Sequence, residues 1–168
     1  SNTEREFLQL IAKQIAIAYS NELLKKEFER SDTRDRLTGL FNATYIDHHL
    51  PGEIKRVASS QKPCSLVLMT IDRFEDYHTA FGHMAAENVL MRLGFLLKET
   101  ISGLDQAARS GDHTFALILP EKNKRHSIEM AEDLKGKIER LFSPEKDPRK
   151  RLTLSFAVTE NPIDGASA

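Results

Sequence analysis

The chain has 168 residues, of which 40% are hydrophobic and 29% are charged, which suits one globular domain with an additional segment. Its 24 basic and 25 acidic residues give a net charge of −1, which provides no electrostatic basis for binding nucleic acid or an anionic membrane. No run approaches the roughly 20 apolar residues of a membrane-spanning helix, and a single cysteine, Cys64, excludes an internal disulfide. We therefore expect a cytoplasmic chain with no membrane span and no nucleic-acid partner within these residues.

The first stretch, Thr3 to Arg30, contains neither Gly nor Pro and has apolar residues at helical spacing. These residues are Leu8, Ile11, Ala12, Ile15, Ala18 and Tyr19. The first half is apolar on more than one face because Phe7, Ala16 and Ile17 widen the stripe, whereas charges dominate the second half. This pattern predicts a long helix that either dimerises through Phe7 to Leu24 or folds back on its own domain.

Ser31 to Asn42, with the sequence SDTRDRLTGLFN, combines turn formers with two leucines. Gly39 is expected to end the leading helix as a left-handed cap, while Leu37 and Leu40 anchor the turn in the core. Asn42 is a favourable N-cap for a helix that starts at the next residue.

The middle of the chain predicts three helices and one buried strand. A helix from Ala43 to Gln61 is expected to be interrupted or restarted at Pro51. Cys64 to Ile71 is an apolar run that favours a central strand, in which the cysteine is a small buried residue. One short helix then ends near Phe81, and a longer helix runs from His83 to about Ile101.

A hairpin is predicted between residues 106 and 120. Gln106 to Arg109 forms one strand, and the continuous apolar run Phe115 to Leu119, closed by Pro120, forms a strand covered on both faces. Three turn formers separate them: Ser110, Gly111 and Asp112. Gly111 is expected to supply the positive φ of a tight hairpin.

The last part of the chain predicts a helix and an edge strand. Asn123 to Phe142 has apolar residues at helical spacing, which indicates an amphipathic helix. Arg151 to Thr159 alternates apolar and polar residues, so one face should be buried near the edge of a sheet.

Four of these stretches together resemble the GGDEF domain of diguanylate cyclases. Asp35, Leu37, Thr38, Gly39, Leu40 and Asn42 match its D-x-L-T-G-L-x-N motif. Ile71, Asp72, Phe74, Gly82 and His83 match its D-I-D-x-F-K-x-x-N-D-x-x-G-H-x-x-G-D stretch. Gly111-Asp112-His113-Thr114-Phe115 stands where the family has Gly-Gly-Asp-Glu-Phe, and Pro162 to Gly165 resembles a late Pro-x-Asp-Gly loop. The resemblance implies an α/β (α+β) fold of the nucleotidyl-cyclase palm type, with a central, mostly antiparallel sheet flanked by helices.

The resemblance also implies an active site from which this chain departs. An active diguanylate cyclase holds two divalent metals on carboxylates from the end of the first strand and the hairpin tip. Thr70 and His113 occupy those positions, and a hydroxyl and a neutral imidazole are poor ligands for Mg²⁺. Thr114 replaces the adjacent acid, while Glu75 and Asp112 place negative charge where the family approaches phosphate. We therefore predict an inactive homologue without metal or cofactor, with Mg²⁺ needed only if the chain is an enzyme after all.

The nucleotide and inhibitory positions are altered as well. The family reads guanine with an Asn and an Asp, which are replaced by His78 and Glu87; both are also ordinary on a solvated helix face. Four positions remain as weak candidates for nucleotide binding: Phe74, His78, Glu87 and Gly111. The inhibitory R-x-x-D site keeps Asp105 but has Ser102 in place of its arginine. Asp72 is the nearby carboxylate that can substitute for a lost metal ligand.

The stretch from Phe7 to Leu24 is similar to the closing helix of GAF sensor domains. We therefore predict a signalling or linker helix over residues 1–31, which can be the end of a GAF domain. A GGDEF-like domain without the last family helix then occupies residues 32–168. The predicted function is a non-catalytic signalling and dimerisation module that forms a homodimer through the leading helix and acts beside an upstream sensor domain. Two alternatives stay open: a diguanylate cyclase with atypical metal ligands, and a receptor for GTP or cyclic di-GMP.

Overall fold

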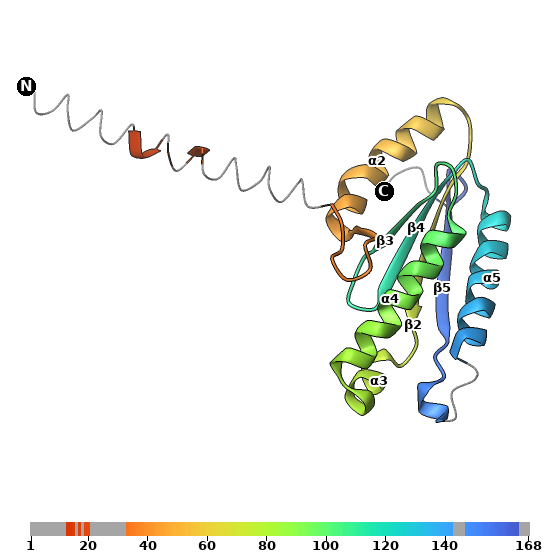
Figure 1. Cartoon of the computed structure of the whole chain (residues 1–168). Coiled ribbons are helices and arrows are strands. Elements are labelled where there is room, and N and C mark those ends of the chain that lie inside the picture. The colour runs from red at the N-terminus through yellow and green to blue at the C-terminus, as the bar shows by residue number, and fades with distance from the viewer. Residues whose placement is uncertain (1–12, 16, 18, 21–32, 143–146, 165–168) are drawn as a thin grey trace, which may run out of the picture. The chain divides into compact units, whose positions relative to one another are not determined.

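The computed structural model describes residues 13–15, 17, 19–20, 33–142 and 147–164 (Figure 1). The chain divides into two compact units, Ser1–Thr33 and Arg34–Ala168, close to the boundary expected at residue 31. In the first unit, residues 13–15, 17, 19 and 20 are helical and exposed. The rest of the expected leading helix, with most of the stretch from Phe7 to Leu24, lies outside the described residues.

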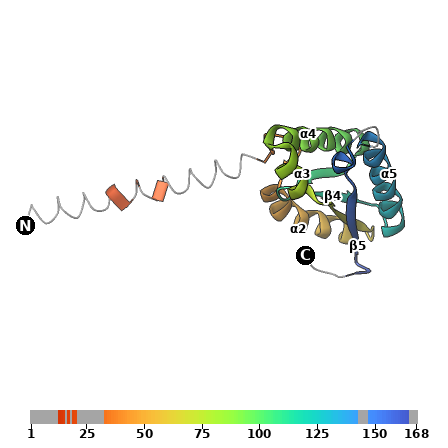
Figure 2. The same cartoon turned by 90° about the horizontal axis from the view of Figure 1, so that it is seen from below.

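The second unit contains a five-stranded sheet with helices on both faces (Figures 1 and 2). Its strands are β1 (Phe41–Asn42), β2 (Cys64–Ile71), β3 (Gln106–Arg109), β4 (Thr114–Pro120) and β5 (Leu154–Asn161). Its helices are α2 (Ala43–Ser59), α3 (Phe74–Phe81), α4 (His83–Thr100), α5 (Lys124–Phe142) and the 3₁₀ helix η1 (Pro148–Lys150). The strand order is β1-β3-β4-β2-β5, and only the β1–β3 pairing is parallel. The mostly antiparallel α/β fold is therefore confirmed.

The two faces of the sheet are covered to different extents. Helices α3, α4 and α5 pack on one face, where Val67, Met69 and Ile71 of β2 enter the larger core cluster. Helix α2 packs on the other face over β1, β3 and β4, through a smaller cluster that includes Ile46 and Val57. Helix α2 also covers the start of β2, where Cys64 and Leu66 join the smaller cluster, but Leu68 further along β2 is 43% exposed on that second face.

Two local predictions at the start of the domain have different outcomes. The N-cap is confirmed, because the Asn42 side chain accepts a hydrogen bond of 3.0 Å from the Tyr45 backbone N–H. The expected interruption at Pro51 is wrong, since α2 is continuous through it. Pro51 lies on the exposed side of α2, so water can satisfy the carbonyl that loses its helical partner.

The predicted role of Gly39 also changes. Gly39 has a φ of +66°, but its backbone N–H donates to the Asp35 carbonyl over 2.7 Å, so it closes a turn around Asp35. The end of the leading helix lies outside the described residues. Leu40 is buried and Leu37 packs against the larger core cluster, which confirms their anchoring role.

The later strands follow the expected pattern. β4 is buried on both faces, and β5 alternates in burial at the edge of the sheet. β5 begins at Leu154, three residues later than expected, because η1 and a short extended segment precede it. Within the part of the chain that the structure describes, no helix has the length and apolar character needed to cross a membrane.

Candidate functional site

The end of β2 carries a row of hydroxyl groups on the uncovered face of the sheet. Thr70 is in register with Thr114 of β4 on one side and with Ser155 of β5 on the other. All three line an open depression of about 350 Å³ whose apolar part includes Leu68 and Ala157. The position at which the family has its first metal-binding carboxylate therefore presents neutral hydroxyls over an apolar surface.

The hairpin tip, Ser110 to His113, is held by its backbone. The N–H groups of Ser110 and Gly111 both donate to the Thr114 carbonyl, over 2.9 and 3.2 Å. Gly111 is not among the residues with positive φ, so the prediction that it supplies one is wrong. The four-residue tip closes through these paired bonds to one carbonyl and does not use a left-handed residue at this position.

Arg109 fixes the tip from the end of β3. Its guanidinium donates to the carbonyls of Gly111 and Asp112, over 3.2 and 2.6 Å, and forms an ion pair of 3.2 Å with Asp35. The other carboxylate oxygen of Asp35 accepts from the backbone N–H and the hydroxyl of Thr38, over 2.8 and 2.6 Å. Burial acts to raise the pKa of Asp35, but the Thr38 hydrogen bonds and the Arg109 charge together hold it below its usual value. One arginine thus joins the D-x-L-T-G-L-x-N turn to the hairpin tip.

His113 lies on the side of the sheet opposite to Thr70. Its ring stacks on Phe74 at a centroid distance of 5.4 Å, and Phe74 belongs to the core cluster under α3 and α4. Its Nδ1 is 3.9 Å from a carboxylate oxygen of Glu75, and this buried atom has no hydrogen-bond partner among the described residues. The two positions are close along the sheet, since the Ile71 N–H donates to the His113 carbonyl over 3.2 Å, but the Thr70 side chain lines the depression on the other face. A hydroxyl and an imidazole on opposite faces do not fit a Mg²⁺ site.

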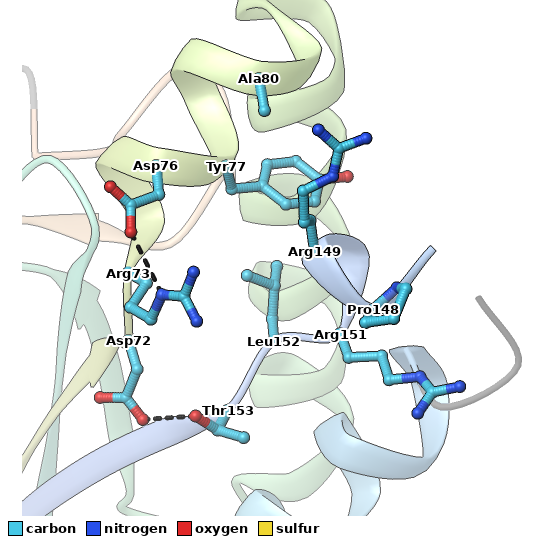
Figure 3. Close-up of a pocket in the computed structure, with 10 residues that line it drawn as sticks. All are labelled: Asp72, Arg73, Asp76, Tyr77, Ala80, Pro148, Arg149, Arg151, Leu152 and Thr153. Carbon is cyan, nitrogen blue, oxygen red and sulfur yellow. Dashed lines mark hydrogen bonds and ion pairs between the residues drawn. The ribbon is translucent and has the colours of Figure 1, made fainter. Parts of the chain in front are cut away.

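Asp72, the carboxylate considered as a substitute, already has partners (Figure 3). Its two oxygens accept hydrogen bonds from the hydroxyls of Thr153 and Ser155, over 2.6 and 2.7 Å. Burial acts to raise the pKa of Asp72, but these hydrogen bonds and the charge of Lys135 lower it. In the described residues, no three His, Cys, Asp or Glu side chains are grouped as a metal site would require.

Asp72 also lies at the edge of a pocket of about 200 Å³ between α3 and residues 148–153 (Figure 3). Arg73 and Arg149 line this pocket, and each has a carboxylate partner: Asp76 at 3.1 Å and Asp147 at 2.7 Å. The hydrogen bonds from Arg149 lower the pKa of Asp147 to about 2. The guanidinium groups of Arg73 and Arg149 are therefore matched by acids from the chain itself.

The guanine-reading positions meet at the corner between α3 and α4. The His78 ring lies edge-on to His83 at 5.8 Å, and Nε2 of His83 is 3.1 Å from a carboxylate oxygen of Glu87. The corner turns at Gly82, which has a φ of +81°. The structure thus brings His78 and Glu87 together through His83, a residue that the sequence did not single out for the site.

The inhibitory-site positions are used inside the fold. The Asp105 side chain is only 2% exposed, forms an ion pair with Lys122, and accepts from the Ser102 backbone N–H over 3.2 Å. The Asp105 backbone N–H donates back to the Ser102 carbonyl, over 3.1 Å. Asp105 therefore closes a turn and neutralises a lysine, and its carboxylate is not presented to solvent. Lys122 gave no local signal in the sequence.

Cys64 is free and buried at the start of β2, as expected. Burial raises the pKa of its thiol to about 11, which keeps it protonated at neutral pH and unreactive.

Comparison with known families agrees with this fold. The family model described as diguanylate cyclase, GGDEF domain, matches residues 32–167, and the chain belongs to this family. An uncharacterized membrane protein of Staphylococcus aureus strain USA300 is 30% identical over 138 residues, which are 80% of this chain and 38% of that protein. A counterpart from Staphylococcus epidermidis is 27% identical over 137 residues. The chain thus spans less than half the length of these relatives.

Solved structures show the same fold. The coiled coil and GGDEF domain of DgcB from Caulobacter crescentus, in complex with c-di-GMP, superposes with a TM-score of 0.72 at 20% identity, covering 89% of this chain and 80% of that one. Diguanylate cyclase SiaD from Pseudomonas aeruginosa, in complex with its activator SiaC, gives 0.70 at 23% identity, covering 96% and 64%. A sensory box/GGDEF family protein from Caulobacter crescentus gives 0.68 at 25% identity, covering 80% and 87%.

Proposed function

We propose that this GGDEF domain is degenerate and catalytically inactive, and that it acts as a signalling and dimerisation module in cyclic di-GMP-type bacterial signalling. The domain lies in the cytoplasm in this proposal, and the leading helix joins it to a GAF-type sensor domain that precedes it in the chain. The main support is the arrangement of Thr70 and His113, which offer a hydroxyl and an imidazole on opposite faces of the sheet. The proposal needs no cofactor and no metal.

The charges around the tip support the same proposal. Glu75 and Asp112 are exposed acids beside the position where a triphosphate binds in an active relative. Each opposes a phosphate charge by roughly 1 kcal/mol in solvent and by more in an enclosed site. Ser102 and the enclosed Asp105 leave the product-inhibition site without its arginine and without an accessible carboxylate.

The decisive experiment is an assay for product. The purified chain is incubated with GTP and either Mg²⁺ or Mn²⁺, and the mixture is analysed by chromatography. We expect no cyclic di-GMP above the blank without protein. Product that disappears in an Asp72→Ala variant would establish the alternative, a diguanylate cyclase with atypical ligands, because Asp72 follows Thr70 by two residues and is the carboxylate that can substitute for it.

A nucleotide receptor is the second candidate, and the cluster of His78, His83 and Glu87 favours it. Glu87 can accept two hydrogen bonds from a guanine edge, as the family's Asp does. Calorimetric titration with GTP and with cyclic di-GMP separates the two functions. The inactive module predicts no binding of either nucleotide, whereas a receptor predicts binding that Glu87→Ala removes and that Glu132→Ala, an exposed control on α5, retains.

Homodimerisation through the stretch from Phe7 to Leu24 is the structural part of the proposal. Its broad apolar face would cost about 25 cal/mol per Å² if exposed to water. Light scattering should show the whole chain as a dimer at tens of micromolar, and deletion of residues 1–30 should give a monomer. An intact chain that is monomeric at that concentration would contradict this part of the proposal.

A further inference from the structure

The outer face of α4 carries three exposed apolar side chains in a line. Met84, Met91 and Phe95 are 84%, 43% and 65% exposed. At 3.6 residues per turn these positions fall within one narrow sector of the helix and span about 16 Å along its axis. Figure 2 shows α4 along the margin of the domain, with no described helix or strand outside it. We call Met84, Asn88, Met91 and Phe95 the α4 stripe.

The spacing of the α4 stripe is that of a coiled-coil seam. Its members follow one another at intervals of four, three and four residues, as the a and d positions of a heptad do. Val89, Leu90 and Leu93, which fall on the opposite side of the helix, are buried in the core. The seam is therefore separate from the face that holds α4 on the sheet, and it is shaped to receive another helix.

We propose that the α4 stripe is a contact between two copies of this chain, with the two α4 helices parallel and in register. Asn88, the polar residue of the α4 stripe, favours an identical helix as the partner. In a parallel pair the two Asn88 amides face each other and can hydrogen-bond, which is a device that fixes register and partner in coiled coils. In an antiparallel pair that sets Met84 against Phe95, each Asn88 would meet Met91 and lose water without gaining a partner.

The flanking charges agree with the parallel arrangement. Glu87 and Arg92 lie on the two sides of the seam, at the positions whose side chains meet across parallel helices. Two-fold symmetry then gives two ion pairs between Glu87 of one copy and Arg92 of the other. Within one chain Glu87 pairs with His83 at 3.1 Å, and the Arg92 guanidinium lies 4.9 Å from the Phe142 ring centroid. The exposed His83–Glu87 pair contributes little, so exchanging it for a partner across the interface has a small cost.

The small size of the α4 stripe limits the affinity of the contact between two copies. The seam ends at Phe95, because the Lys98 side chain folds back over Gly39. A single helix face of this length buries less than the about 800 Å² per partner of a standard interface. The contact is therefore weak when it acts alone and needs concentrated protein or a tether. It does not depend on the leading helix, and a monomer at tens of micromolar after deletion of residues 1–30 is compatible with it.

Site-directed disulfide cross-linking of the whole chain tests the proposal. Asn88→Cys should form a disulfide-linked dimer on mild oxidation, several-fold more than the matched variant Glu132→Cys on the exposed side of α5. The natural Cys64 is buried, so its background is low. Adding Met91→Glu, or Phe95→Ser as a second variant, should reduce the yield to that of the control while circular dichroism stays unchanged.

Cross-linking yield also tests the proposed ion pairs and the parallel direction of the two helices. Glu87→Arg should lower the Asn88→Cys yield at low salt, and Glu87→Arg combined with Arg92→Glu should restore it. Equal yields from Asn88→Cys and Glu132→Cys would overturn the contact. A mixture of Asn88→Cys and Met91→Cys chains that cross-links better than Asn88→Cys alone would overturn the parallel arrangement.

Discussion

The turn from Arg34 to Leu40 and the hairpin tip from Ser110 to His113 share one arginine, yet they are built differently. In the turn, side chains reinforce the backbone hydrogen bonds: Asp35 binds Thr38 twice and Arg109 once. In the tip, Arg109 holds backbone carbonyls only, and the side chain of Asp112 is exposed. The difference teaches that the shape of the tip does not depend on the residues at its signature positions. The residues at the signature positions of the tip can therefore change without loss of the fold.

The largest expected effect comes from breaking the turn. Asp35→Ala removes both Thr38 hydrogen bonds and leaves Arg109 without its carboxylate, so we expect a loss of about 2–3 kcal/mol of unfolding free energy. Urea denaturation measures this loss. Asp47→Ala, an exposed acid on α2, is the control and should change stability by less than about 0.5 kcal/mol. Equal losses in both variants would remove the basis of the comparison.

The second effect comes from the glycine behind the turn. A Cβ at Gly94 would lie 2.7 Å from the Thr38 Cβ, so Gly94→Ala forces the turn away from α4 and should cost about 1–3 kcal/mol. Gly52→Ala is the same change in α2 with nothing within 4 Å of the new methyl group. It should stabilise the domain by up to about 1 kcal/mol through helix propensity. Thermal denaturation should therefore show melting temperatures that shift in opposite directions in the two variants. An unchanged melting temperature in Gly94→Ala would show that the close approach of Gly94 to Thr38 does not limit stability.

A smaller effect is the acid sensitivity of the turn. The folded pKa of Asp35 is lower than its unfolded value, so its contribution is present at neutral pH and is lost as the pH falls from about 4 through the folded pKa. The difference in melting temperature between the wild type and Asp35→Ala should therefore narrow as the pH is lowered in this range. A difference that stays constant to low pH would mean that the charge of Asp35 is not what stabilises the turn.

The smallest effect is expected at the tip. Asp112→Gly removes an exposed side chain that holds no other segment in place, so unfolding free energy should change by less than about 0.5 kcal/mol. His113→Ala also removes the ring stacked on Phe74, and it should cost at most about 1 kcal/mol. Urea denaturation under the conditions used for Asp35→Ala allows direct comparison. A loss of more than about 1 kcal/mol at either position would show that the tip side chains do support the fold.

Much of the fold was predictable because its signals are local. The apolar run of β2, the turn formers of the β3–β4 hairpin and the N-cap Asn42 each specify structure within a few residues, and all three are confirmed. Pro51 and Gly111 gave wrong expectations because average preferences were applied to an exposed helix face and to a four-residue tip that closes through its backbone.

The site was less predictable because its contacts join distant parts of the chain. Arg109 was visible as the last residue of the predicted strand Gln106 to Arg109, but its ion pair with Asp35 exists only after β1 and β3 come together. The same holds for Lys122, which meets Asp105 at the open end of the β3–β4 hairpin. The opposite directions of Thr70 and His113 follow from strand register, which the sequence pattern leaves open.

The parallel pairing of β1 with β3 determines the order in which these contacts can form. The β3–β4 hairpin closes a loop of only a few residues, and such hairpins form within about 1–10 μs. Phe41 and Asn42 must instead find Ala108 and Arg109 across most of the intervening domain, which is a slow, non-local step. The Arg109 contacts within the tip span two or three residues, whereas its ion pair with Asp35 joins residues that are 74 apart in the sequence. We therefore expect φ-values from mutants to be higher for the hairpin contacts than for the contact between Asp35 and Arg109.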